Sequence, residues 1–301
     1  MKKSLLLVAV TLLISVFSQV LAQEPAMPGP PKVLYIVRED IKPGMMPIHN
    51  RHSAEYAAIF AKLQSPNHRI ALVPVAGSEN EVLYLNPAQS FAEVEKMNQD
   101  TDRKMSAVNA SMQPQIDRLE KETPTLHTAM RDMLAIYRPE LSFNPGVPIA
   151  QMRYFSITTI RIRPGHDAQY AEYVQKMVNV ARQKAKVDSL HLAVFQIISG
   201  APGGTYMVFR PMKSLSEMDE PINMKVRAAM GDDMRKDADK TYGEAVMSSE
   251  VSTYSFAPRM SYVSDEFARQ DSEFWHPKAE MAAKPKPKRR APKPPPQPPA
   301  N

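Results

Sequence analysis

Two stretches of this sequence repeat the same pattern. VLYIVREDIKPG (33–44) and YFSITTIRIRPG (154–165) are both β-rich runs that end at a basic residue followed by Pro-Gly. Each is followed by a helical pattern, two short apolar runs joined by a Gly-containing loop, and a Ser-x-x-Glu capping signal, SFAE at 90–93 and SLSE at 214–217. This repeat predicts two modules, each with the order β-α-β-β-α-β.

That order is typical of a ferredoxin-like α+β module, with four antiparallel strands and two helices on one face. The predicted strands are nearly continuous apolar runs, which indicates that both sheet faces are buried. We therefore predict modules at 32–145 and 152–258, joined by a linker at 146–151 and packed sheet to sheet as an intramolecular pseudo-dimeric α/β barrel. The first module is longer, and we expect an additional short helix at 114–127.

The N-terminus has the three parts of a secretory signal peptide: a positive start, an apolar run and small residues before a polar segment. We predict cleavage after residue 22, a short linker at 23–31, and a periplasmic or secreted protein of bacterial type. The alternative is an uncleaved membrane anchor. After the second module, residues 259–277 are predicted as a C-terminal extension and 278–301 as a disordered basic Pro-rich tail.

Charge is concentrated at the two ends of the chain. The formal net charge is +6; the signal contributes two positive charges and residues 278–301 a net +6, which leaves −2 on residues 23–277. The tail is either simply solvated or a tether to an anionic envelope polymer or lipid headgroups. Nucleic acid is not expected, because no aromatic residues interleave with the basic ones. The absence of cysteine excludes disulfides, a thiol nucleophile and thiolate metal sites.

The strand ending in basic-Pro-Gly and the Ser-Phe/Leu-x-Glu helix start resemble the dimeric α/β-barrel superfamily, in its antibiotic-biosynthesis monooxygenase-like and NIPSNAP-like branch. The resemblance covers both modules and implies a barrel built from two of them. It implies a range of functions, from cofactor-free monooxygenases to haem proteins and small-molecule isomerases. It carries over no catalytic residue, so catalytic residues stay unknown.

Candidate ligand-binding residues are polar groups on the predicted strands and on the first helix, where a buried polar group needs a partner. His49 and His52 are spaced i, i+3 and share a helix face. Cross-strand pairing or solvation at strand ends is the alternative role for the strand residues. The candidates are Tyr35, Arg38, His52, Tyr56, Ser156, Thr158, His191, Tyr206 and Arg210.

No carboxylate stands at clear ligand spacing from these histidines, so no metal site is predicted. No cofactor is predicted either; the resemblance leaves haem open. We expect an exported, non-catalytic module that binds a small apolar or aromatic ligand or a partner, with a tethering tail. The alternative is a small-molecule oxygenase-like enzyme, cofactor-independent or haem-linked, acting inside the barrel. The chain is expected to be a monomer with pseudo-dimeric halves, able to dimerise further through an open strand edge.

Overall fold

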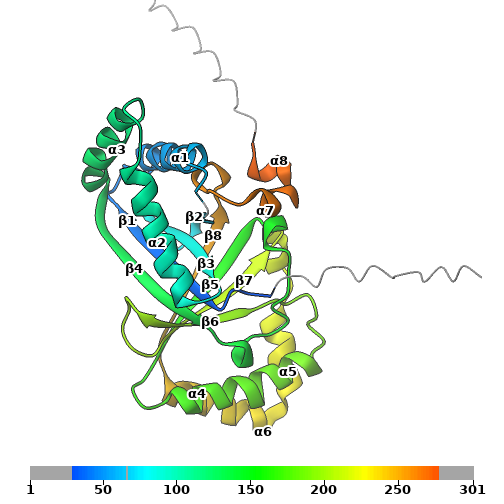
Figure 1. Cartoon of the computed structure of the whole chain (residues 1–301). Helices are drawn as coiled ribbons and strands as arrows, with labels where there is room; N and C mark the ends of the chain where they lie inside the picture. Colours follow the sequence, from blue (N-terminus) through cyan, green and yellow to red (C-terminus); the bar gives the residue numbers. More distant parts are fainter. Residues whose placement is uncertain (1–28, 66, 278–301) are drawn as a thin grey trace, which may run out of the picture.

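A computed structural model describes residues 29–65 and 67–277, so the predicted signal peptide and basic tail lie outside the described residues. Eight strands form one closed barrel in the order β1-β3-β2-β8-β5-β7-β6-β4 (Figure 1). This confirms an α+β barrel. The strands are β1 (Val33–Ile41), β2 (Ile70–Ala76), β3 (Glu81–Ala88), β4 (His127–Tyr137), β5 (Tyr154–Ile162), β6 (Ala193–Ser199), β7 (Thr205–Met212) and β8 (Val246–Phe256).

All neighbouring strands pair antiparallel, and the two halves join through β2–β8 and β4–β6. The first half supplies β4-β1-β3-β2 and the second supplies β8-β5-β7-β6. The two halves therefore form one continuous hydrogen-bonded sheet closed into a barrel. This differs from the expected arrangement of two separate sheets packed face to face. β4 pairs with β6 only over Leu134–Tyr137, and β8 pairs with β2 only over Thr253–Phe256, so the preceding part of each of these two strands is paired on one side only. The expected further dimerisation through an open strand edge stays a prediction.

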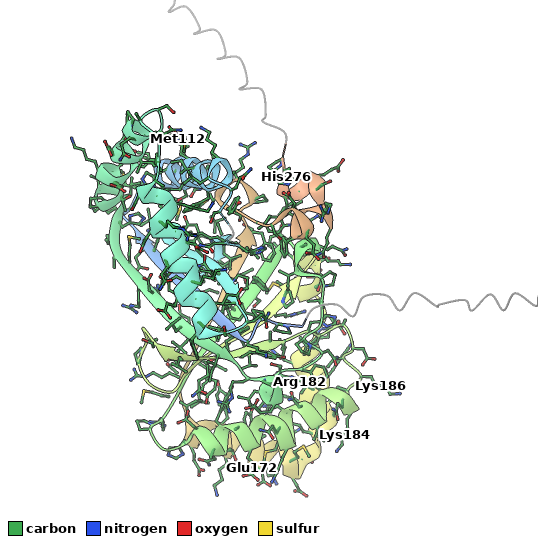
Figure 2. All side chains as sticks on the ribbon, in the orientation of Figure 1. Met112, Glu172, Arg182, Lys184, Lys186 and His276 are labelled. Carbon is green, nitrogen blue, oxygen red and sulfur yellow. The ribbon has the colours of Figure 1, made fainter. Side chains whose placement is uncertain are left out.

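Apart from the two short helices near the C-terminal end of the described residues, the helices lie outside the barrel in two groups, one over each half (Figure 1). Figure 2 shows Met112 in the group over the first half, with Arg182 and Lys184 in the group over the second. No helix within the described ranges is long and apolar enough to cross a bilayer. The helices are α1 (Met46–Lys62), α2 (Phe91–Ser106), α3 (Gln113–Leu126), α4 (Asp167–Tyr173), α5 (Asn179–Lys184), α6 (Ile222–Ala245), α7 (Asp265–Arg269) and α8 (Ser272–Trp275). A short π-helix, η3 (Val174–Val178), joins α4 to α5.

Short 3₁₀ turns complete the chain: η1 (Pro139–Leu141), η2 (Ile149–Gln151), η4 (Leu215–Met218) and η5 (Pro258–Met260). The capping box at Ser214 starts only η4, because Pro221 intervenes before α6 begins. The predicted additional helix is present as α3, but it is not unique to the first half. Both α3 and the part of α6 after a break at Gly231 run into the last strand of their half.

Alternation along β1 divides its side chains between two environments. Leu34 and Ile36 point into the barrel, which a cluster of buried apolar side chains from both halves fills. Tyr35, Val37 and Glu39 point to the opposite face, beneath the helices. A binding pocket is therefore to be sought on the helix-covered face of the sheet.

The segment after β8 belongs to the barrel core. Trp275 on α8 is 3% exposed, packs in the apolar cluster of the barrel, and donates its indole N–H to the Ala150 carbonyl at 2.8 Å. Arg153 forms an ion pair with Asp271 and lies over the Phe274 ring. The predicted linker and C-terminal extension therefore close the barrel together.

Candidate functional site

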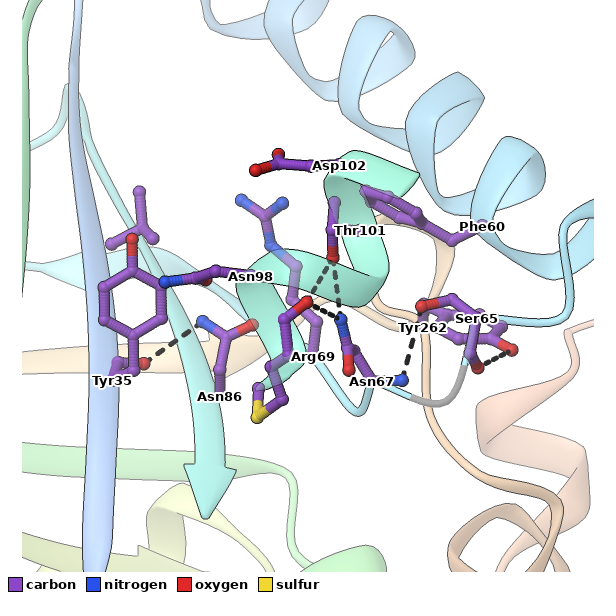
Figure 3. Close-up of a pocket in the computed structure, with 12 residues that line it drawn as sticks. Tyr35, Phe60, Ser65, Asn67, Arg69, Asn86, Asn98, Thr101, Asp102 and Tyr262 are labelled. Atoms are coloured by element: carbon purple, nitrogen blue, oxygen red, sulfur yellow. Dashed lines mark hydrogen bonds between the residues drawn. The ribbon is translucent and has the colours of Figure 1, made fainter. Parts of the chain in front are cut away.

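The outer face of the first half holds two adjoining cavities that share Val37, Phe60, Arg69 and Tyr262. The first, here called the polar lobe, has a volume of about 400 Å³. Figure 3 shows the Arg69 side chain within it, between Tyr35 and Thr101. The second, the histidine lobe, has a volume of about 320 Å³. The polar lobe is lined in addition by Tyr35, Ser65, Asn67, Asn86, Met97, Asn98, Thr101 and Asp102, and the histidine lobe by Glu39, His52, Ser53, Tyr56, Ala57, Tyr84, Thr123, His127, Met130, Asp132 and Met260.

At the histidine lobe, one carboxylate oxygen of Glu39 lies within hydrogen-bond distance of two imidazole rings. Glu39 Oε2 lies 2.7 Å from His49 Nε2 and 3.2 Å from His127 Nε2. The two rings are edge to face, with centroids 5.2 Å apart. All three residues are buried, at 6%, 0% and 9% exposure for Glu39, His49 and His127. A buried charge requires such partners, so this cluster is an ionic network inside the protein.

Three different elements bring these groups together. Glu39 is on the outer face of β1, and His49 is in the first turn of α1, whose N-terminus begins at Met46 with Pro47. His127 is the residue at which α3 ends and β4 begins. Sequence reasoning missed this set because its three members come into contact only when the fold places the α3–β4 junction beside β1.

Hydrogen bonds set the protonation of the cluster. Burial alone would raise the pKa of Glu39, but hydrogen bonds from His127 and His49 outweigh it and lower that pKa to about 2. Burial would lower the pKa of His127, and its bonds to Glu39 and to the Thr123 carbonyl raise it instead. His127 Nδ1 lies 2.7 Å from the Thr123 carbonyl oxygen, which only accepts, so Nδ1 carries a proton.

Arg69 connects the two lobes. Its guanidinium carbon is 3.8 Å from the centre of the Tyr84 ring, and its Nη2 is 4.0 Å from Glu39 Oε1. Its Nε is buried and has no hydrogen-bond partner among the described residues. Leaving a buried donor unpaired costs about 1–3 kcal/mol. The Arg69 side chain borders both lobes, and none of the described residues supplies an acceptor to its Nε.

The structure brings three of the nine candidate residues to this pocket. Tyr35 lines the polar lobe and donates to Asp132 at 2.8 Å; His52 and Tyr56 line the histidine lobe. Burial raises the pKa of Tyr35 to about 12, with the Asp132 carboxylate adding to the effect. His52 Nε2 lies 3.0 Å from the Leu119 carbonyl oxygen.

The other six candidates lie elsewhere. Arg38 pairs with Glu81 at 2.6 Å on the inner side of β1. Ser156 and Thr158 are on β5, and Arg210 on β7 donates to the Glu217 carbonyl. His191 Nδ1 lies 2.7 Å from the Asn144 carbonyl oxygen. Tyr206 donates to Asp167 at 3.1 Å.

The second half provides an internal comparison at matching strand positions. Glu39 pairs with Val82 on β3, and Ile160 pairs with Tyr206 on β7; the bulged pairs Ile41–His127 and Ile162–Val246 also match. His49 and Tyr170 also match in their helices, where each donates its backbone N–H to the carbonyl four residues earlier, that of Met45 or His166. The cluster of Glu39, His49 and His127 thus corresponds to Ile160, Tyr170 and Val246, which pack in an apolar cluster. The fold itself does not require a charged network at this place.

The pocket does not fit a histidine-bound haem. A haem iron bound by histidine needs an imidazole nitrogen that faces the haem. His49 and His127 direct Nε2 to Glu39, and His52 directs Nε2 to a backbone carbonyl. The space between them is bordered by Arg69 and Asp132.

No protein-family model matches the sequence, and no curated protein matches it. Solved structures similar to this chain include an anthrone oxidase-like protein, with 12% identity over 75% of this chain and 92% of that one and a TM-score of 0.47. Chlorite dismutase of Candidatus Nitrospira defluvii has 10% identity over 80% of this chain and 95% of its own, with a TM-score of 0.45. A provisionally assigned monooxygenase of Lactobacillus acidophilus has 9% identity over 77% and 99%, with a TM-score of 0.43. These similarities are too distant to assign an activity, so function has to be argued from the pocket.

Proposed function

We propose that this chain binds a small aromatic or apolar molecule that carries a carboxylate or another oxygen acceptor, in the pocket between the barrel and α1–α3. The observation that carries the proposal is the side chain of Arg69, which lines both lobes and whose Nε has no hydrogen-bond partner among the described residues. Hydrogen bonds from a guanidinium to a carboxylate are about twice as strong as neutral ones, and its planar fork of N–H groups matches the two carboxylate oxygens.

The rest of the lining supports an organic ligand rather than a bare anion. Tyr35, Phe60, Met97 and Tyr262 border the polar lobe beside Arg69. Ligand sites typically combine such apolar and aromatic walls with a few polar groups that fix orientation. Asn67 is already bound to the Met97 carbonyl and to Thr101, which holds this wall in place.

The test is calorimetric titration of residues 23–301 with benzoate, and with benzylamine as the oppositely charged control. Benzoate is expected to bind and benzylamine not to bind. Arg69→Gln is expected to weaken benzoate binding at least tenfold, which corresponds to about 1.4 kcal/mol. Arg161→Gln, an exposed strand arginine of the second half, serves as the matched control and is expected to bind like the wild type. Equal binding by the wild type and Arg69→Gln contradicts the proposal.

The alternative, an oxygenase-like enzyme, was placed by the sequence analysis inside the barrel. Buried apolar side chains of both halves fill that space. An enzyme of this fold would have to use the outer pocket, where Glu39 supplies an ionised carboxylate and His127 an imidazole of raised pKa that is hydrogen-bonded to it. Binding without turnover and binding with turnover are separated by mass spectrometry of the ligand recovered after incubation.

We also propose that the two halves are copies of one ferredoxin-like module, as in a fused member of the dimeric α/β-barrel superfamily, and that only the first copy carries the pocket. The matched strand registers and the matched Pro-Gly turns support this. Native mass spectrometry of the protein from its own cells tests the second part: one added ligand mass per chain is expected, and two contradict it.

Export and tethering remain proposals from the sequence. The N-terminal 22 residues support secretion, and the basic residues of 278–301 support attachment to an anionic polymer or lipid surface of the envelope. Deleting 278–301 is expected to move the protein from the envelope fraction to the soluble fraction without changing its melting temperature. Equal fractionation of both forms contradicts the tether.

A further inference from the structure

Glu39, His49 and His127 form a set of metal-type donors. One oxygen and two imidazole nitrogens, each from a different residue, all lie within 4.8 Å of one another, and no other such group occurs among residues 29–65 and 67–277. Two imidazoles and one carboxylate are a donor set that binds divalent transition metals and leaves other coordination positions open.

The separations of the donors fit a shared ion. Ligands at about 2.1 Å from a metal lie about 3.0 Å apart when they occupy neighbouring octahedral positions. Glu39 Oε2 lies 2.7 Å from His49 Nε2 and 3.2 Å from His127 Nε2, which brackets that value. An ion would replace the protons that now lie between the carboxylate and the two rings.

The surroundings orient the donors as an outer ligand shell does. His127 Nδ1 donates to the Thr123 carbonyl at 2.7 Å, so Nε2 is the nitrogen that would bind an ion once its proton toward Glu39 is displaced. Asn50 Oδ1 lies 3.4 Å from His49 Nδ1 and favours the same tautomer there. The second carboxylate oxygen, Glu39 Oε1, faces Arg69 at 4.0 Å, so Oε2 is left for the ion.

The second half builds the corresponding place without such residues. Ile160, Tyr170 and Val246 occupy the corresponding places and are themselves uncharged. A buried ion pair gives little net stability relative to such apolar packing. Its presence in one half only therefore calls for a role beyond folding.

We propose that Glu39, His49 and His127 bind one divalent first-row transition metal ion, such as Zn²⁺ or Fe²⁺, at the floor of the histidine lobe. Glu39 and His127 themselves line that lobe, so the remaining coordination positions open toward the pocket. The site stands independently of the anion-binding proposal, since the donors are supplied entirely by the protein.

The test uses untagged residues 23–301, because a histidine tag would itself bind metal. After EDTA treatment and removal of the chelator, the protein is titrated with Co²⁺ alone, and bound metal is counted by elemental analysis. One Co²⁺ per chain is expected, with visible d–d absorption that Zn²⁺ abolishes by competition. No binding at stoichiometric concentration overturns the proposal.

Variants assign the site. His127→Gln and Glu39→Gln are expected to weaken Co²⁺ binding at least about 100-fold, more than loss of an outer-shell partner costs. His52→Gln is the matched control: His52 is one turn from His49 and lines the same lobe, but its Nε2 is held by the Leu119 carbonyl. Circular dichroism checks folding, and Glu39→Asp replaces Glu39→Gln if the latter unfolds. Equal Co²⁺ affinity in His127→Gln and His52→Gln overturns the assignment. Benzoate is omitted throughout, so a failure of ligand binding and a failure of metal binding are distinguished.

Discussion

The guanidinium of Arg69 lies 3.8 Å above the ring of Tyr84, whose hydroxyl donates to Ser53 at 2.7 Å. The ring therefore holds the arginine while the hydroxyl anchors the ring to α1. Tyr84→Phe keeps the ring and is expected to retain benzoate affinity within about threefold, at a stability cost of about 1 kcal/mol for the lost hydrogen bond. Tyr84→Leu removes the cation–π contact and is expected to weaken benzoate binding at least fivefold, because Arg69 loses its support. Titration calorimetry and urea unfolding measure the two effects, and equal affinity in both variants argues against this role of the ring.

A second prediction concerns the buried network. Glu39→Ile alone leaves two imidazoles buried without their acceptor and is expected to destabilise the fold by about 3 kcal/mol. The triple variant Glu39→Ile, His49→Leu, His127→Val removes the whole network, as the second half does with Ile160 and Val246. It is expected to be at least as stable as the wild type, because apolar packing replaces a costly buried ion pair. Urea unfolding in EDTA compares the variants; a triple variant weaker than the single one would make the network a requirement of the fold.

His68 contributes to the pH dependence of stability. Burial lowers the pKa of this histidine from 6.5 to about 4, and its ring lies edge-on against Phe267 at 4.6 Å. On acidification the unfolded chain takes up the proton near pH 6.5, whereas the folded protein resists until about pH 4, so stability is lost as pH falls through this interval. Between pH 7.5 and pH 5 the loss from this group is up to about 2 kcal/mol.

Urea unfolding at the two pH values measures it. His68→Gln is expected to reduce the loss by that amount, whereas His276→Gln, an exposed histidine, is expected to leave it unchanged. The same slope in both variants would assign the acid sensitivity to other groups.

The junction of β4 and β6 depends on Gly200. Its φ is +86°, and a Cβ atom there would lie 1.9 Å from the Asp132 carbonyl oxygen. Gly200→Ala is therefore expected to cost more than 2 kcal/mol of unfolding free energy. The alanine would be strained at this positive φ, and the backbone at Asp132 would also have to move to make room for the Cβ atom. Gly44→Ala has a similar φ of +79° with open space around it, and is expected to cost only about 1 kcal/mol. The difference in urea midpoint between the two isolates the close approach.

The elements were predictable from the sequence where local chemistry decides them. Ser90 caps α2 by accepting from Glu93 N at 3.2 Å, and the Pro-Gly turns place Gly44 and Gly165 at positive φ, as their patterns indicate. The helix expected directly after Ser214 is reduced to one turn, since Pro221 restarts the helix instead. Local patterns thus give the order of elements more reliably than their bounds.

The site was less predictable, because it depends on which face of the strand a residue occupies and on contacts between residues far apart in the sequence. Whether Glu39 faces the barrel or the helices depends on which side the helices cover, and His127 contacts it across 88 residues of sequence. One signal was available without a structure. Aligning 33–44 with 154–165 places Glu39 opposite Ile160, so a charged residue stands where the other segment has an aliphatic one, on a strand predicted to be buried on both faces. His52 and Tyr56 were found because helix spacing places them on one face with His49.

Closure of the barrel has a consequence for how such a chain can be divided. Each half ends its four strands in two bare edges, at β2 and β4 or at β8 and β6, and only the other half satisfies them. A cut between β4 and β5 would therefore yield two fragments with exposed backbone donors and acceptors, each complete only after pairing with another four-stranded fragment. The two halves are therefore joined in one hydrogen-bonded ring, and separating them would break the β2–β8 and β4–β6 pairings together.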